Sequence, residues 1–513
     1  MPRNLHAEFK SVAVFRVGAC PLTVLKDFTV KRKVVLASSL TFAALAIAYV
    51  GGSYFAGQAV EKTMQKQHDW LSNLPYFIVK SHNYQRGWFS STETTTLQVR
   101  PELYRFLLEK EGQPLQKFEV TYTNHIKHGP LPLLTQFNFL PYKAAVNTEF
   151  AFSADTQKFL AKFFGEQKPI TIENRISFND DGIVRLSVPS FEYEEALSGI
   201  KAHWKGLEAT LDYGGDFNRV TLIANAPGIT GEAKTKGQFA LADFSLKMQQ
   251  VRGTSGIMIG NTDAKIGKLD LQLIEGTPIK LNLENLTYAG DIKEAGEFIN
   301  GSAKIDLAKL ILDGQTYGPA VLIAEANHLH GKTLAKIGDE LSLIQKQNLD
   351  SEQLTAALTH LAKTHGLPLL QNDPQLAIKK LEVKLPDGKI HFTGEVGLKG
   401  FVAADLDKPV DLVNKISAKA DFAVPRKVVE TLALWQARNV FGGPDTQVDL
   451  DSLDFLAGQF VEGQINRLAE QNLIRVEGKL LATTASLNKG IFILNGIKVP
   501  LPWETPAANS EAK

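Results

Sequence analysis

Two pairs of histidines are the residues best suited to metal chemistry. His125 and His128 lie three positions apart, and His328 and His330 lie two positions apart on what we expect to be one face of a strand. A metal site needs three or four converging ligands, and this spacing nominates no third ligand. The chain also has no H-E-x-x-H or C-x-x-C motif. The sequence therefore predicts solvated or hydrogen-bonded histidines and no metal.

Motifs for catalysis are incomplete. Glu192, Glu194 and Glu195 could supply paired carboxylates, but a solvated strand explains them equally well. Gly331-Lys332-Thr333 resembles the end of a phosphate loop, yet Ala326 stands where that loop needs glycine. We expect Thr333 to cap a helix instead. The sequence thus predicts no catalytic residue and no cofactor, and it favours a protein that is not an enzyme.

Length and composition set the class of protein. The chain has 513 residues, of which 44% are hydrophobic and 22% charged, so it is long enough to bury a core and is not a disordered chain. The net charge of +1 lacks the positive field that nucleic-acid binding requires, so we expect no nucleic-acid partner. Cys20 is the single cysteine, which excludes a disulfide framework.

An uncharged stretch near the N-terminus predicts a membrane anchor. No residue between Lys33 and Glu61 is charged, and residues 34–56 are long enough to cross a bilayer as one helix. Basic residues outnumber acidic ones in residues 1–33, which predicts a cytoplasmic tail there. We expect a single-pass protein of a bacterial inner membrane with its bulk in the periplasm. The alternative is a signal peptide cleaved after Ala48, although the apolar part of such peptides is usually shorter.

Alternation of apolar and polar residues dominates the rest of the chain. It predicts a β-rich antiparallel region over residues 57–330 and a mixed β/α region over residues 371–513. Pro386-Asp387-Gly388 supplies a turn between two such runs, which predicts a hairpin. Residues 331–370 instead show helical spacing and predict a helical insertion. The fold class is therefore α+β, and one extended sheet, a barrel or two sandwiches would all fit the strands.

Two motifs beyond the apolar stretch resemble a known family. Tyr84-Gln85-Arg86-Gly87-Trp88-Phe89-Ser90-Ser91 is similar to the Y-x-R-G-x-F-S-S signature of the YdgA-like (YdgA/YihF) bacterial envelope proteins, and His128-Gly129-Pro130-Leu131-Pro132-Leu133 is similar to its H-G-P-x-P-L companion. The similarity runs from Lys31 to about Pro500. This family has no known function, and the resemblance implies an uncleaved inner-membrane anchor with a large periplasmic domain. Its Gly-Pro-x-Pro run predicts an extended connection.

The motif residues are the candidate binding residues. Arg86, Trp88 and Phe89 could form a membrane-proximal patch in which the arginine meets a phosphate or carboxylate, and we add His128 to it. The alternative is a β-bulge in which the two aromatic rings fill a core and the arginine binds turn carbonyls.

Three functions remain open from the sequence. The first is a non-enzymatic protein that binds or organises an envelope component, most concretely a lipid held in an apolar groove between amphipathic strands. The second is a periplasmic hydrolase with a carboxylate or histidine site near His125, His128 or Glu192. The third is homotypic assembly through sheet edges or the helical insertion.

Overall fold

A helix of 46 residues, α1 (Phe28–Asn73), leads into the sheet. The computed structural model describes residues 28–74, 76–101, 119–195, 197, 199–275, 278–347, 349–441 and 450–501, and for 28–47, 155, 437–441 and 450–453 it describes the backbone alone. Within the part of the chain so described, no helix is both long and apolar enough to cross a membrane. The predicted tail (1–33) and residues 34–47 of the predicted anchor lie outside the residues whose side chains are described.

The described residues form one antiparallel sheet of 23 strands. The strands are β1 (Phe77–Arg86), β2 (Ser90–Val99), β3 (Glu119–His128), β4 (Ala144–Ala151), β5 (Thr171–Ile176), β6 (Gly182–Val188), β7 (Phe191–Glu195), β8 (Ile200–Trp204), β9 (Leu207–Tyr213), β10 (Arg219–Ala233), β11 (Gly237–Arg252), β12 (Met258–Leu273), β13 (Ile279–Ala295), β14 (Phe298–Leu312), β15 (Gln315–Tyr317), β16 (Ala320–His330), β17 (Gln375–Leu385), β18 (Gly388–Leu398), β19 (Ile416–Pro425), β20 (Arg475–Glu477), β21 (Leu480–Asn488), β22 (Ile491–Leu494) and β23 (Ile497–Val499).

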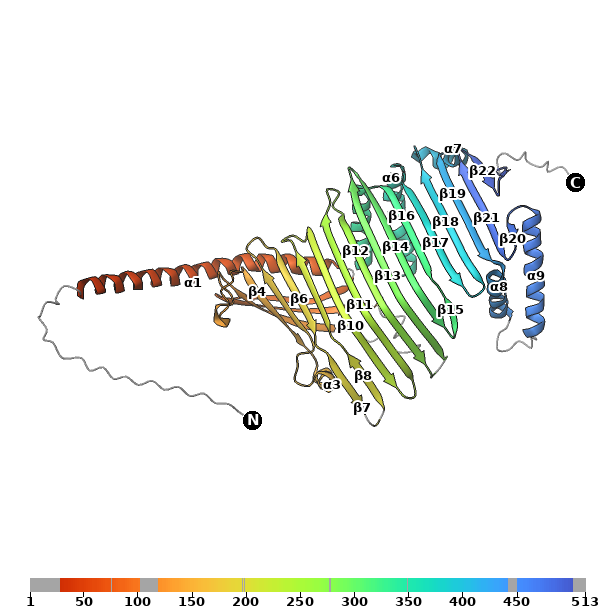
Figure 1. The fold of residues 1–513 in the computed structure, drawn as a ribbon. Helices are drawn as coiled ribbons and strands as arrows, with labels where there is room; N and C mark the ends of the chain where they lie inside the picture. The colour runs from red at the N-terminus through yellow and green to blue at the C-terminus, as the bar shows by residue number, and fades with distance from the viewer. Residues whose placement is uncertain are drawn as a thin grey trace, which may run out of the picture.

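Most strands pair with their neighbours along the chain. The ladder runs β1-β2-β3-β4-β5-β6, passes to β9, and continues through β10-β11-β12-β13-β14-β16-β17-β18-β19 to β21-β22-β23. The short strands β8, β15 and β20 pair at the ends of the longer strands β10, β14 and β21, and β7 pairs with β8. Of the arrangements that the sequence left open, the structure is the single extended sheet (Figure 1).

Helices are inserted between strands of this sheet. They are α3 (Ala154–Phe164), α4 (Gly331–Lys346), α5 (Ser351–Leu361), α6 (Leu367–Leu370), α7 (Pro409–Lys415), α8 (Arg426–Phe441) and α9 (Leu450–Glu470), with shorter turns η2 (Leu134–Gln136), η3 (Ala362–Gly366) and η4 (Ala403–Asp407). In the view of Figure 1, α4 and α6 lie behind the strands. The fold is thus a large antiparallel sheet with helical insertions.

The helices α4 and α5 begin differently. Asp350 caps α5, because its side chain accepts a hydrogen bond from the backbone N–H of Gln353. The prediction that Thr333 caps α4 was wrong. The helix begins at Gly331 with His330 as its N-cap residue, and the Thr333 hydroxyl hydrogen-bonds the His330 ring.

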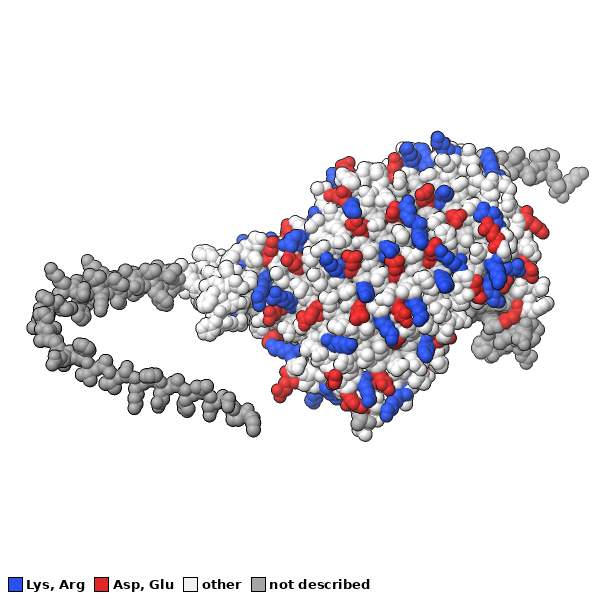
Figure 2. Space-filling view, viewed as in Figure 1, with Lys and Arg blue, Asp and Glu red and all other residues white. Residues whose placement is uncertain are grey.

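The two faces of the sheet differ in chemistry. Because opposed residues of antiparallel strands point to the same side, the pairing registers define rows of side chains across the sheet. The face seen in Figure 2 carries Lys and Arg interspersed with Asp and Glu. The opposite face is largely apolar, and α1 packs on it at one end. At the other end Val461 and Ile465 of α9 pack with Val424 and Leu481 of the sheet.

Candidate functional site

A groove on the apolar face is the candidate binding site with the most apolar lining. One row of opposed residues crosses nine neighbouring strands, and most of its members are small: Met248, Thr262, Gly290, Ala303, Ala324, Ile378, Gly394, Ala420 and Ala485. The next row on the same face is Gly260, Ile292, Gly301, Ala326, Leu376, Val396, Ala418, Leu487 and Phe492. Together the two rows make a floor without a charged side chain.

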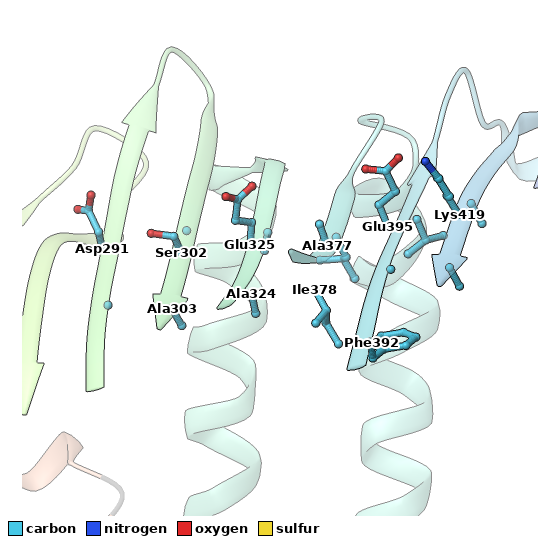
Figure 3. A pocket seen from close by; sticks show the side chains of 18 of the residues that line it. Asp291, Ser302, Ala303, Ala324, Glu325, Ala377, Ile378, Phe392, Glu395 and Lys419 are labelled. Atoms are coloured by element: carbon cyan, nitrogen blue, oxygen red, sulfur yellow. The ribbon is translucent and has the colours of Figure 1, made fainter. Parts of the chain in front are cut away.

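The small residues leave room above this floor. A cavity of about 890 Å³ lies along it, within the range of about 300–1,000 Å³ that is typical of small-molecule sites. All of its lining residues belong to strands. Figure 3 shows Ala324, Ile378 and Phe392 at the cavity, while the charged ends of Glu325 and Glu395 are directed away from them. This follows from the alternation of side chains along each strand.

The apolar side chains of the groove remain partly open to solvent. Leu376 is 51% exposed, Val396 45% and Tyr288 40%. Exposed apolar surface of this extent is uncommon on a soluble monomer and marks a surface that contacts apolar ligands or partners. The groove, meaning the apolar face of β11 to β22, can therefore take up an elongated apolar molecule.

The same face is covered where α1 crosses the first strands. We call α1 residues 49–73 and the strands beneath them the docking interface. Val60 and Met64 of α1 are buried against Ile126, Val146 and Ile176. Ile126 and Val146 belong to the row that continues into the groove through Asn174, Val184, Leu211 and Leu222. One apolar face is thus closed by a helix at one end and open further along.

His128 lies inside the docking interface, so it is not an exposed binding residue. Its Nδ1 lies 3.1 Å from the Ser53 carbonyl oxygen, and its Nε2 lies 3.1 Å from the Ser91 hydroxyl. A Cβ at Gly57 would come within 2.7 Å of the His128 ring, so glycine is required for this close approach. Burial lowers the pKa of His128, which favours the neutral ring that fits these two partners.

Arg86, Trp88 and Phe89 meet α1 from the turn between β1 and β2. Arg86 forms an ion pair of 2.8 Å with Glu61 and lies over the ring of Tyr54. Trp88 is 62% exposed and Phe89 46%, so the alternative in which these rings fill a core was wrong. The chain does turn at Gly87, whose N–H donates to the Ser90 carbonyl.

Exposed apolar side chains lie on three segments: α1, the turn between β1 and β2, and the loop after β3. They are Phe55, Trp88, Phe89, Phe137, Phe139 and Leu140, and we call them the apolar collar. Contacts tie their three segments together: the Tyr54 ring lies 5.4 Å from that of Trp88, and the Tyr49 hydroxyl donates to the Leu131 carbonyl. The chain bends at residues 129–131 and turns at 132–133 before η2 begins, so the extended connection predicted for the Gly-Pro-x-Pro run was wrong.

A buried ion pair was missed by the sequence reasoning. The Lys143 ammonium, with its side chain 8% exposed, pairs with Asp180, and both bind the hydroxyl of Thr63 on α1. Burial opposes ionisation of Asp180, but the hydrogen bonds from Lys143 and Thr63 prevail and lower its pKa. The three residues are 37 to 117 positions apart, so no local pattern could reveal the pair.

The residues nominated for a hydrolase do not converge. His125 pairs with Glu149 and Glu192 pairs with His203, and these side chains are 41 to 83% exposed. His128 is buried under α1, while His328 hydrogen-bonds the Asn372 carbonyl. The described geometry therefore brings together no nucleophile, base and oxyanion donor from these residues.

Comparison with known proteins identifies a family and no function. Residues 32–502 match the model of the family described as bacterial protein of unknown function (DUF945), and the chain belongs to this family. No curated protein and no solved structure matches the chain.

Proposed function

We propose that this member of the DUF945 family holds the acyl chains of a lipid in its groove while α1 anchors it to a bacterial inner membrane. The observation that carries the proposal is the half-exposed apolar floor across β11 to β22. Binding an acyl chain there would remove apolar surface from water, worth roughly 25 cal/mol per Å². The protein would then act as a binding protein and not as an enzyme.

The position of the apolar collar supports the membrane part of the proposal. The uncharged residues 34–56 run directly into the helical turns that carry it. Tryptophan and phenylalanine side chains are favoured at the boundary between lipid headgroups and hydrocarbon. Trp88 and Phe89, with Arg86 beside them, would then contact the bilayer surface, and the bulk of the chain would lie in the periplasm. In this we follow the resemblance to the YdgA-like envelope proteins.

A groove-blocking variant tests the lipid function. Ala324→Trp places an indole on the floor of the groove, and Ala289→Trp makes the same change on the charged face of the neighbouring region, where Ala289 opposes Lys304. We expect the wild type and Ala289→Trp to copurify with phospholipid and to bind fluorescent palmitate, and Ala324→Trp to lose at least nine-tenths of both. Lipid-free wild-type protein, or equal binding by the two variants, would sink the proposal.

Topology is tested separately. Reporter fusions after residue 501 and protease treatment of spheroplasts should place the sheet outside the cytoplasm. A reporter active only in the cytoplasm would contradict the anchor, and a mature N-terminus after Ala48 would replace it with a cleaved signal peptide.

A further inference from the structure

A cluster of three ligand-type side chains lies inside the docking interface. His68 of α1, His82 of β1 and Glu93 of β2 each place one ligand atom within 4.8 Å of the other two. The rings of His68 and His82 are stacked with their centroids 3.7 Å apart. Among the described residues, this is the cluster in which two histidines and a carboxylate all lie within that distance of one another.

Several of these ligand atoms lack a hydrogen-bond or close ion-pair partner among the described residues. Nδ1 of His68 is buried without a hydrogen bond. Nε2 of His82 faces Oε1 of Glu93 at 3.8 Å, which is too long for a hydrogen bond. Glu93 is only 2% exposed. Among the described residues, the imidazole of His82, 3.8 Å away, is its one ion-pair partner. A buried carboxylate beside two imidazoles is poorly satisfied without a cation.

A surrounding shell already orients the ligands. Nδ1 of His82 lies 3.0 Å from the Thr95 hydroxyl, so a proton on Nδ1 leaves the Nε2 lone pair directed at the cluster. Oε2 of Glu93 accepts a hydrogen bond from Asn124 at 2.7 Å, which leaves Oε1 free. Such outer contacts are typical of metal ligands.

We propose that His68, His82 and Glu93 form a binding site for a divalent metal ion of the zinc class. Two imidazoles and one carboxylate are a ligand set that Zn²⁺ accepts, with a remaining position for water. Ligands at about 2.1 Å from the ion lie about 3.4 Å from each other in tetrahedral geometry, so atoms that lie within 4.8 Å of one another must approach by up to about 1.4 Å. One imidazole must also rotate out of the stack so that both lone pairs point at the ion. Exposed Asp69 adds a negative charge near both rings. The ion would tie α1 to the first two strands.

Zinc titration of the full chain in detergent tests the site. We expect the wild type, freed of metal by a chelator, to bind one Zn²⁺ per chain and to gain several degrees in Tm. His82→Ala and Glu93→Gln should weaken zinc binding at least tenfold. His125→Ala is the matched control, since His125 lies on the next strand, is half-exposed and pairs with Glu149, and it should bind like the wild type.

Two outcomes would overturn the site. One is wild-type protein that retains no zinc at micromolar concentration. The other is a loss in His125→Ala as large as that in His82→Ala, which would mean adventitious surface binding. If His82→Ala fails to fold in chelator, Co²⁺ spectroscopy of the wild type and of Glu93→Gln decides. An intense visible band reports Co²⁺ held at four- or five-coordination by the protein; we expect it in the wild type and expect it weakened in Glu93→Gln, and its absence from the wild type contradicts the proposal.

Discussion

The docking interface and the groove are two parts of one sheet face: α1 covers the first, and the second is open to solvent. Beneath α1 the face carries buried apolar residues such as Ile126, together with a polar network in which Lys143, Asp180 and Thr63 meet. In the groove the same row consists of small residues, and its neighbours such as Leu376 are half-exposed. The comparison teaches that one repeating strand pattern forms a buried core where a helix covers the face and an open apolar surface where none does.

Introducing an aspartate into each part should produce the largest difference in the free energy of unfolding. Ile126→Asp buries an unpaired carboxylate in a site that is 1% exposed, and we expect it to lower the free energy of unfolding by more than about 4 kcal/mol. Leu376→Asp on the same face, 51% exposed, should cost less than about 1 kcal/mol and abolish palmitate binding. Urea unfolding of both variants measures this, and equal losses would mean that the groove is an ordinary core.

Glycine replacements sharpen the comparison. Gly57→Leu would drive a side chain into the buried ring of His128, and we expect a loss of about 2–3 kcal/mol. At Gly394 in the groove, the nearest obstacle is the end of the Phe392 ring, which can move aside, so Gly394→Leu should cost less than about 1 kcal/mol. Thermal unfolding of the two variants provides the measurement. A Gly57→Leu protein as stable as the wild type would contradict the close contact between helix and sheet.

The buried ion pair gives the docking interface a pH dependence. Asp180→Asn leaves Lys143 buried without a counter-ion, and we expect a loss of about 2 kcal/mol at pH 7, reduced from the full buried-pair value because Asp180 is 28% exposed. The pKa of Asp180 is lower in the folded state, so its contribution is complete above the unfolded value of about 3.9 and disappears as pH falls below it.

The control for this pair is the double variant Lys143→Met, Asp180→Asn, which removes the stranded charge and should recover part of the loss. Unfolding at pH 7 and pH 3 should show a smaller acid sensitivity in Asp180→Asn than in the wild type. If Asp180→Asn loses as much stability between pH 7 and pH 3 as the wild type does, other carboxylates are responsible for the acid sensitivity.

The smallest effect is expected at the motif arginine. The Arg86–Glu61 pair is 37% and 43% exposed, so Arg86→Gln should cost about 0.5 kcal/mol or less. Trp88→Ala should be equally mild in stability while weakening binding of the detergent-free protein to anionic vesicles. A large loss of stability from either change would mean that the motif serves to hold α1 on the sheet, and it would contradict the proposed contact of the apolar collar with the membrane.

Sequence periodicity predicted much of the sheet, because alternation and turn residues are local signals. The turn predicted at Pro386-Asp387-Gly388 matches the connection of β17 to β18. The floor of the groove left a weaker signal, since Gly290, Ala303 and Ala324 occur at alternate apolar positions of separate strands. Only the registers bring them into one row.

The docking interface could not be predicted, because its partners are distant in the chain. The two motifs around Arg86 and His128 stood out as candidates for binding, but they meet each other on α1, and only Trp88 and Phe89 stay largely exposed. His68 and His82 are 14 positions apart and lie on a helix and a strand, so no ligand spacing distinguished them from solvated histidines.

The antiparallel ladder has a consequence for how such proteins can vary over evolution. Adding or removing a single strand would reverse the direction of every later one and misplace the helices that follow. Adding or removing a whole hairpin preserves the direction of the later strands and the face to which their side chains point, provided that the register is kept. The length of the apolar floor is therefore adjustable in units of two strands, without redesigning either end of the sheet.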